Sequence, residues 1–145
     1  RPGDRTHAID AAVRWTRTAA NDEVRGWLDD ALAASGPEYG PHIGFVRIAF
    51  THAFRHLAQG TAYRAAIEET LLGGGDTDTN AAIVGGLLGA ADGMRSLPRD
   101  LITPVLLGRT AHPARRRPAF SDASTAPALA ERLLRVAPTD SAAAG

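Results

Sequence analysis

The sequence contains neither cysteine nor lysine, and these two absences exclude several kinds of site. Without cysteine there is no disulfide framework and no thiolate ligand for zinc or another soft metal. Without lysine there is no Walker A loop, because that loop needs a lysine to reach the bound phosphates. The lack of thiols suits a reducing compartment, and we therefore expect a cytoplasmic location.

Long apolar runs and an excess of one charge are also missing. Sixteen basic residues, all of them arginine, balance sixteen acidic residues. No uncharged run approaches the roughly 20 apolar residues that a membrane-spanning helix needs. We therefore expect neither a nucleic-acid partner nor a membrane partner. At 145 residues the chain has room for one hydrophobic core.

Helical periodicity is present along most of the chain. Apolar residues recur three and four positions apart, and no strand-like alternation competes with this pattern. Asn21 and Thr61 are expected to cap two of the helices. We predict an all-α fold, an irregular or orthogonal multi-helix bundle. The expected helices cover residues 6–20, a segment after Asn21, and residues 43–58, 62–72, 81–91, 97–107 and 125–136.

Two histidines and a row of glycines need separate interpretation. His52 and His56 stand four residues apart, as zinc-binding histidines do on a helix, but the glutamate expected after the first is Ala53. We expect surface or helix-packing histidines instead. Gly85, Gly89 and Gly93 lie on one helical stripe, and each costs about 0.5 to 1 kcal/mol relative to alanine inside a helix. Close approach of another helix would offset that cost, so we expect this helix to be the most buried.

Residues 73–80 read Gly-Gly-Gly-Asp-Thr-Asp-Thr-Asn, and two interpretations fit this segment. Two carboxylates and a hydroxyl near a turn are the oxygen ligands that Mg²⁺ and Mn²⁺ prefer. Alternatively, the glycines end one helix and Asp76, Asp78 or Thr79 caps the next. An EF-hand loop is excluded, because its sixth and twelfth positions would be Ala81 and Leu87.

The run from Gly74 to Ile83 resembles the C-terminal metal-binding signature of the ADP-ribosylglycohydrolase family. The resemblance continues upstream through Gly44, Phe45 and Val46. It covers about residues 44–107 well and the flanks loosely. It implies an ADP-ribosylglycohydrolase-like all-α fold, with residues 1–137 as the C-terminal part of the domain. By composition, residues 138–145 are expected to form a disordered tail.

The resemblance also implies a function. Asp76, Asp78 and Thr79 would be ligands of a Mg²⁺ or Mn²⁺ pair, with the other ligands in an N-terminal part of the same fold that this chain lacks. The complete protein would be a metal-dependent hydrolase of the glycosidic bond in ADP-ribose conjugates, either ADP-ribosylated proteins or small acceptors. This chain would then be an incomplete fragment with half of a dinuclear site. The alternative is a non-catalytic helical interaction or regulatory module, a pseudoenzyme that retains the metal loop.

The substrate side of the site is expected on the loop that enters the helix over residues 43–58. In the resembling family this loop lies near the bound ADP-ribose. His42, Gly44 and Phe45 are therefore candidates for contact with an ADP-ribose-containing substrate.

Overall fold

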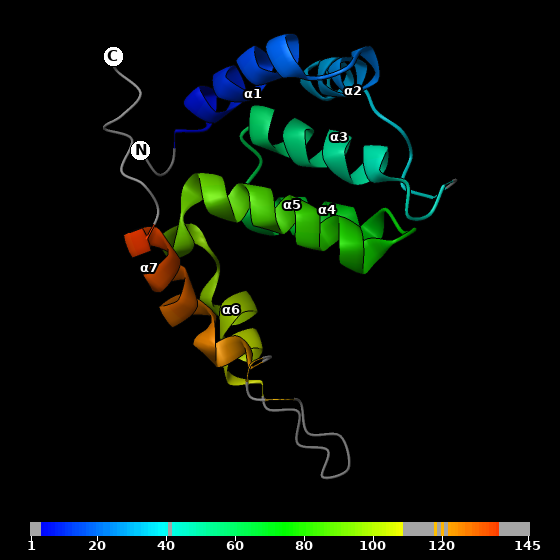
Figure 1. Ribbon diagram of the computed structural model, residues 1–145. Coiled ribbons are helices and arrows are strands. Elements are labelled where there is room, and N and C mark those ends of the chain that lie inside the picture. Colours follow the sequence, from blue (N-terminus) through cyan, green and yellow to red (C-terminus); the bar gives the residue numbers. More distant parts are fainter. Residues whose placement is uncertain (1–3, 41, 109–117, 119, 121, 137–145) are drawn as a thin grey trace, which may run out of the picture. The chain divides into compact units, whose positions relative to one another are not determined.

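A computed structural model describes residues 4–40, 42–108, 118, 120 and 122–136. Within these residues the regular structure is entirely helical, which confirms the predicted fold class (Figure 1). The chain forms two compact units, residues 1–98 and residues 99–145. The helices are α1 (Arg5–Ala19), α2 (Asp22–Leu32), α3 (Val46–Ala58), α4 (Tyr63–Leu72), α5 (Thr77–Asp92), the 3₁₀ turn η1 (Met94–Ser96), α6 (Arg99–Leu107), the 3₁₀ turn η3 (Ala123–Thr125) and α7 (Ala126–Val136).

The first unit is built around α3. This helix contacts α1 and α2 on one side and α5 on the other, while α4 packs against α5 (Figure 1). Because it is covered on two sides, α3 buries seven residues: Ile48, Ala49, Thr51, His52, Ala53, His56 and Leu57. The glycine-rich helix α5 buries only Asn80, Val84, Gly85 and Leu88. The expectation that α5 would be the most buried helix is therefore wrong.

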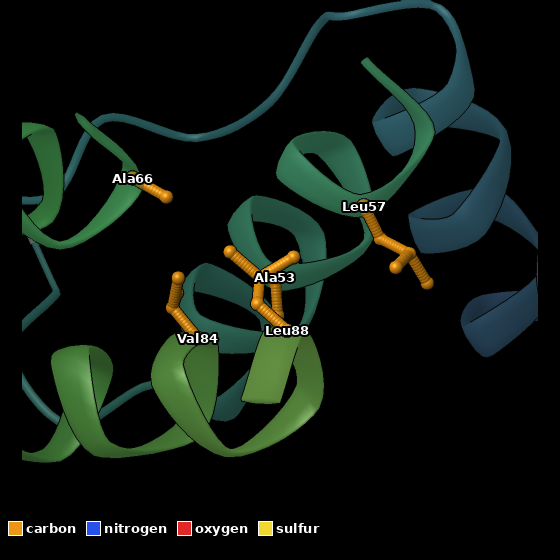
Figure 2. Packing of buried hydrophobic residues seen from close by; sticks show 5 residues of the cluster. All are labelled: Ala53, Leu57, Ala66, Val84 and Leu88. Carbon is orange, nitrogen blue, oxygen red and sulfur yellow. The ribbon is translucent and has the colours of Figure 1, made fainter. Parts of the chain in front are cut away.

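The hydrophobic core lies between α3, α4 and α5, as Figure 2 shows. Its members are Ala53 and Leu57 of α3, Ala66 of α4, and Val84 and Leu88 of α5. Each exposes 2% of its surface or less. Full burial of a leucine or valine side chain contributes about 1.5 to 3 kcal/mol, so these contacts are the main source of stability in the unit.

A half-buried ion pair joins the start of α1 to the end of α5. The Arg5 guanidinium donates from Nε to Oδ1 of Asp92 at 2.7 Å and from Nη2 to Oδ2 at 2.5 Å. Its Nη1 also donates to the carbonyl oxygen of Thr61 at 2.9 Å. The guanidinium holds the pKa of the Asp92 carboxyl below its usual range. A bidentate pair of this kind is more directional than a single contact and fixes the relative position of the two helix ends.

Most helix starts differ from the sequence prediction by one to four residues, and two of them affect the capping or the candidate site. The N-cap of α4 is Ala62 rather than Thr61, and no side chain caps this end. Helix α5 begins at Thr77 instead of residue 81, so Asp78 and Thr79 belong to its first turn. Glycine and aspartate before a helix are also typical of a loop, which is why the start was placed too late.

The second unit contains α6, η3 and α7, and α6 includes Pro104. In the described part of this unit no side chain is fully buried. The expected tail over residues 138–145 lies outside the described residues. Across the helices that the structure describes, none combines the length and the apolar character that a bilayer crossing would need.

Candidate metal centre

Asp76 and Asp78 lie together at the N-terminus of α5. Asp76 occupies the N-cap position, and Asp78 is in the first turn. The Asp78 pKa lies below its usual range, first because of a hydrogen bond with the Asp76 side chain. The second cause is the backbone, because the N–H of Thr79 donates to Oδ1 of Asp78 at 3.0 Å. Both carboxylates thus belong to the start of the same helix.

The hydrogen bonds at the start of α5 bear on the capping interpretation of this segment. A capping aspartate accepts a hydrogen bond from the backbone N–H two or three residues further on. Asp76 makes no such bond, although Asp4 and Asn21 do so at the starts of α1 and α2. The Asp78 bond to its immediate neighbour Thr79 is not a capping bond either. The carboxylates are therefore not used to cap the helix, and their oxygens stay available to a ligand.

The glycines in front of Asp76 determine how the chain enters α5. Gly74 and Gly75 have φ angles of +78° and +68°, which L-residues with a Cβ rarely adopt. Two consecutive residues in this region reverse the chain sharply after α4 ends at Leu72. The reversal brings Asp76 to the end of the bundle where the loop before α3 lies.

The loop before α3 approaches Asp76 at Gly44. A methyl group built on Gly44 would lie 3.9 Å from Oδ2 of Asp76, and the φ angle of Gly44 is +80°. His42 and Phe45 stand on the same loop, with ring centroids 6.4 Å apart in an edge-to-face arrangement. Phe45 also contacts Trp27 edge-to-face at 6.0 Å. The structure thus brings Gly44 to the carboxylates, while His42 and Phe45 form a partly exposed aromatic edge on that loop.

The donor set suits a hard divalent cation. Asp76 and Asp78 supply carboxylate oxygens, and Thr79 follows with an exposed hydroxyl-bearing side chain. Among the described residues, no arginine or histidine forms an ion pair with either carboxylate. Two adjacent carboxylates without a positive partner repel each other when both are ionised, and a bound Mg²⁺ or Mn²⁺ would remove that repulsion.

This donor set is small. Within the part of the chain that the structure describes, no group of three or more histidine, aspartate or glutamate side chains could hold a metal ion. Asp76 and Asp78 are a pair, and the acidic residues of the neighbouring helix are engaged elsewhere, as in the ion pair between Arg55 and Glu69. His52 and His56 are helix-packing residues on the buried face of α3, which is one of the two roles expected for them.

Sequence reasoning missed Tyr39, which connects these parts. Glycine and proline in residues 35–41 predict a loop that can line a site, and they assign no role to Tyr39. In the structure Tyr39 is buried, with 9% of its surface exposed, and it contacts both α3 and the glycine segment. A single aromatic residue in an otherwise small and polar loop was the available signal, because exposing such a ring has a free-energy cost.

Comparison with known proteins gives one match. Residues 2–142 match the sequence model of a family described as ADP-ribosylglycohydrolase. No curated protein and no solved structure matches the chain. The family match covers both compact units and includes the glycine segment, the carboxylate pair and the loop at Gly44.

Proposed function

Because the chain belongs to the ADP-ribosylglycohydrolase family, we propose that it contributes part of a divalent-metal site to hydrolysis of the glycosidic bond in ADP-ribose conjugates. The observation that carries the proposal is the position of Asp76 at the N-cap and of Asp78 in the first turn of α5. Neither carboxylate caps the helix, and both belong to the segment that resembles the family's metal signature.

Asp76, Asp78 and Thr79 would hold the metal through oxygen atoms. Mg²⁺ and Mn²⁺ are favoured over softer metals, because the chain offers no thiol and His52 and His56 are buried in helix packing. When bound, a pair of such ions can orient hydroxyl groups, lower the pKa of water and stabilise developing negative charge. The carboxylates of this chain would fix the position of those ions relative to α5.

The loop before α3 would hold the substrate. Gly44 lacks a side chain where the loop meets Asp76, so a ligand could approach the backbone closely there. Phe45 exposes 41% of its surface, and His42 is exposed beside it. Aromatic rings with one free face are suited to stacking on a nucleobase. We assign to them contact with the ADP-ribose part of the substrate, which is common to protein and small-molecule conjugates.

The chain would supply one half of a dinuclear site. Two carboxylates and a hydroxyl leave most positions of an octahedral ion to water or to other ligands. In the resembling family, further carboxylates and a hydroxyl-bearing residue come from far upstream of this signature. We propose that such a segment completes the site, and that residues 1–145 alone bind a divalent ion weakly and do not turn over substrate.

The alternative is a non-catalytic module that retains the metal loop for stability. The two functions differ in what Asp78 does once the site is complete. In a hydrolase the Asp78→Asn change removes turnover, whereas in a module it changes metal-dependent stability only. The proposed cytoplasmic location is compatible with both.

The first test measures Mn²⁺ binding to the 145-residue chain. Two methods report the bound ion: titration calorimetry, and the loss of the electron paramagnetic resonance signal of free Mn²⁺. We expect weak saturable binding that the Asp78→Asn variant lacks. The matched control is Asp29→Asn, which removes a carboxylate from the exposed surface of α2. If Asp29→Asn reduces binding as much as Asp78→Asn does, the ion binds to surface charge and the proposed site is wrong.

Turnover is measured separately as release of ADP-ribose from a modified arginine or serine peptide. The 145-residue chain should release none, and a chain extended to include acidic upstream ligands should release it in an Asp78-dependent manner. Rapid turnover by residues 1–145 alone would refute the half-site proposal. Full activity of an extended Asp78→Asn protein would remove Asp78 from the mechanism.

A further inference from the structure

Tyr39 is fixed between two helices of the first unit. Its ring stacks on the imidazole of His52, with centroids 3.8 Å apart and planes 10° from parallel. Its hydroxyl oxygen lies 3.5 Å from Oγ1 of Thr70. The Thr70 hydroxyl already donates to the carbonyl of Ala66 at 2.7 Å, so the tyrosine is the donor in this long contact. Burial raises the pKa of the Tyr39 hydroxyl, which therefore stays protonated at neutral pH.

The backbone around Tyr39 is held against α3 as well. Nε2–H of His52 donates to the carbonyl oxygen of Pro37 at 2.9 Å, because a carbonyl can only accept. A methyl group built on Gly36 would lie 2.8 Å from Cγ2 of Thr51, so the chain also passes close to the helix there. Residues 36–39 are thus positioned by α3 before they reach the glycine segment.

Tyr39 is also in close contact with the glycine segment. A methyl group on Gly73 would lie 2.2 Å from Cδ2 of the tyrosine ring. A methyl group on Gly75 would lie 2.2 Å from the carbonyl oxygen of Tyr39. Both distances are far inside van der Waals contact, which begins at about 3.5 Å between heavy atoms. At Gly74, between them, a methyl group would meet nothing within 4 Å. Gly73 and Gly75 are therefore required by contact with Tyr39, and Gly74 only by its φ angle.

These contacts lie directly beside the carboxylates. Gly75 is bonded to Asp76, so the carbonyl of Tyr39 limits the path by which the chain enters α5. We propose that Tyr39 is a positioning residue for the divalent-metal site. Tyr39 is held by α3 and α4, and it contacts Gly73 and Gly75. These contacts fix the segment that leads into Asp76 and Asp78. The inference rests on the proposed metal site and adds the residue that sets its geometry.

The experiment compares Mn²⁺ affinity in variants of the full 145-residue chain. Tyr39→Ala removes the ring and should weaken binding about 10- to 100-fold, the range typical of residues that orient metal ligands. Tyr39→Phe keeps the ring, the stacking on His52 and the backbone, and should bind Mn²⁺ as tightly as the unchanged chain. Gly75→Ala should also weaken binding, because its methyl group would collide with the backbone carbonyl of Tyr39. Gly74→Ala has a comparable φ angle without the clash and should weaken binding less than Gly75→Ala.

Two controls separate positioning from a general loss of stability. Leu57→Ala removes a core side chain at the opposite end of α3, and it should lower the unfolding midpoint without weakening Mn²⁺ binding well below that midpoint. If Tyr39→Ala does not fold, Tyr39→Leu takes its place, since it keeps apolar volume and loses the flat ring. Unchanged Mn²⁺ affinity in a folded Tyr39→Ala or Tyr39→Leu protein overturns the inference. Equal weakening by Leu57→Ala overturns it too. Absence of Mn²⁺ binding by the unchanged chain would refute the proposed metal site itself, and the inference with it.

Discussion

At the residue scale, the buried face of α3 contains several polar side chains. Thr51 and His56 have no exposed surface, and His52 exposes 7%. In the described structure, Oγ1 of Thr51 and Nδ1 of both histidines have no hydrogen-bond partner. Burial, together with the nearby Arg55 guanidinium, lowers the pKa of His56 from 6.5 to about 4. His56 is therefore neutral in the folded protein throughout the physiological pH range.

The burial of His56 predicts loss of stability in weak acid. The unfolded chain takes up a proton near pH 6.5, whereas folded His56 does so only near pH 4. Between these values the unfolded state binds more protons, so the free energy of unfolding falls as the pH is lowered from about 6.5 to about 4. At about 1.4 kcal/mol per pKa unit, His56 accounts for on the order of 3 kcal/mol of this fall. Urea unfolding followed by circular dichroism at several pH values measures it.

The variant His56→Leu isolates the effect, because leucine fills a similar volume and does not titrate. The fall between pH 6.5 and 4 should become shallower, with a remainder from His52, whose pKa burial also lowers. His7→Gln removes a histidine from the exposed surface of α1 and should leave the fall unchanged. An identical pH dependence in the unchanged chain and in His56→Leu would show that His56 is not responsible.

At the element scale, the glycines of α5 have different reasons for being there. A methyl group on Gly85 would lie 2.9 Å from the hydroxyl oxygen of Tyr63 and 3.1 Å from Cδ1 of Ile67, both on α4. At Gly89 the nearest atom is 3.7 Å away, on Leu97. Gly93 has a φ angle of +82° and ends the helix. The glycine stripe predicts a close approach of another helix. That approach is made by α4 at Gly85, and it does not extend to Gly93.

A pair of substitutions one residue apart tests this crossing. Gly85→Leu should destabilise the protein by about 1 to 3 kcal/mol, because overpacking forces α4 and α5 apart. Gly86→Leu should stabilise it by up to about 1 kcal/mol, because Gly86 meets nothing within 4 Å and leucine is a better helix former. The measurement is the thermal unfolding midpoint of each variant, compared with that of the unchanged chain. A similar shift in both variants would show that the two positions are equally tolerant and that α4 does not approach at Gly85.

The helices themselves were readable from the sequence because each carries a local apolar period. The carboxylate pair was readable too, since Asp76 and Asp78 belong to one short motif. Tyr39 was not, because its environment depends on contacts with residues 13 to 36 positions further along the chain, such as His52 and Gly75. The start of α5 was misplaced for the opposite reason: local turn chemistry at residues 73–80 is strong, and the helix begins within it.

At the scale of the whole molecule, the two units differ in how their apolar residues are used. The first unit, residues 1–98, contains the buried core and the carboxylate pair. In α7 of the second unit the apolar residues stay largely exposed: Leu129, Leu133, Leu134 and Val136 expose between 52% and 82% of their surface. Exposed apolar stripes of this kind add little to stability, because they stay in contact with water.

This difference predicts that the first unit keeps its fold and its metal site without the second. A chain ending at Pro98 retains Tyr39, the glycine segment, the carboxylates and every core residue between Ala8 and Ala91. Its unfolding midpoint should lie within about 5 °C of that of the 145-residue chain, the shift that roughly 1 kcal/mol produces in a protein of this size. Its Mn²⁺ affinity should match that of the longer chain. A larger loss of midpoint together with weaker Mn²⁺ binding would show that residues 99–145 support the site, and the first unit would then not be sufficient for it.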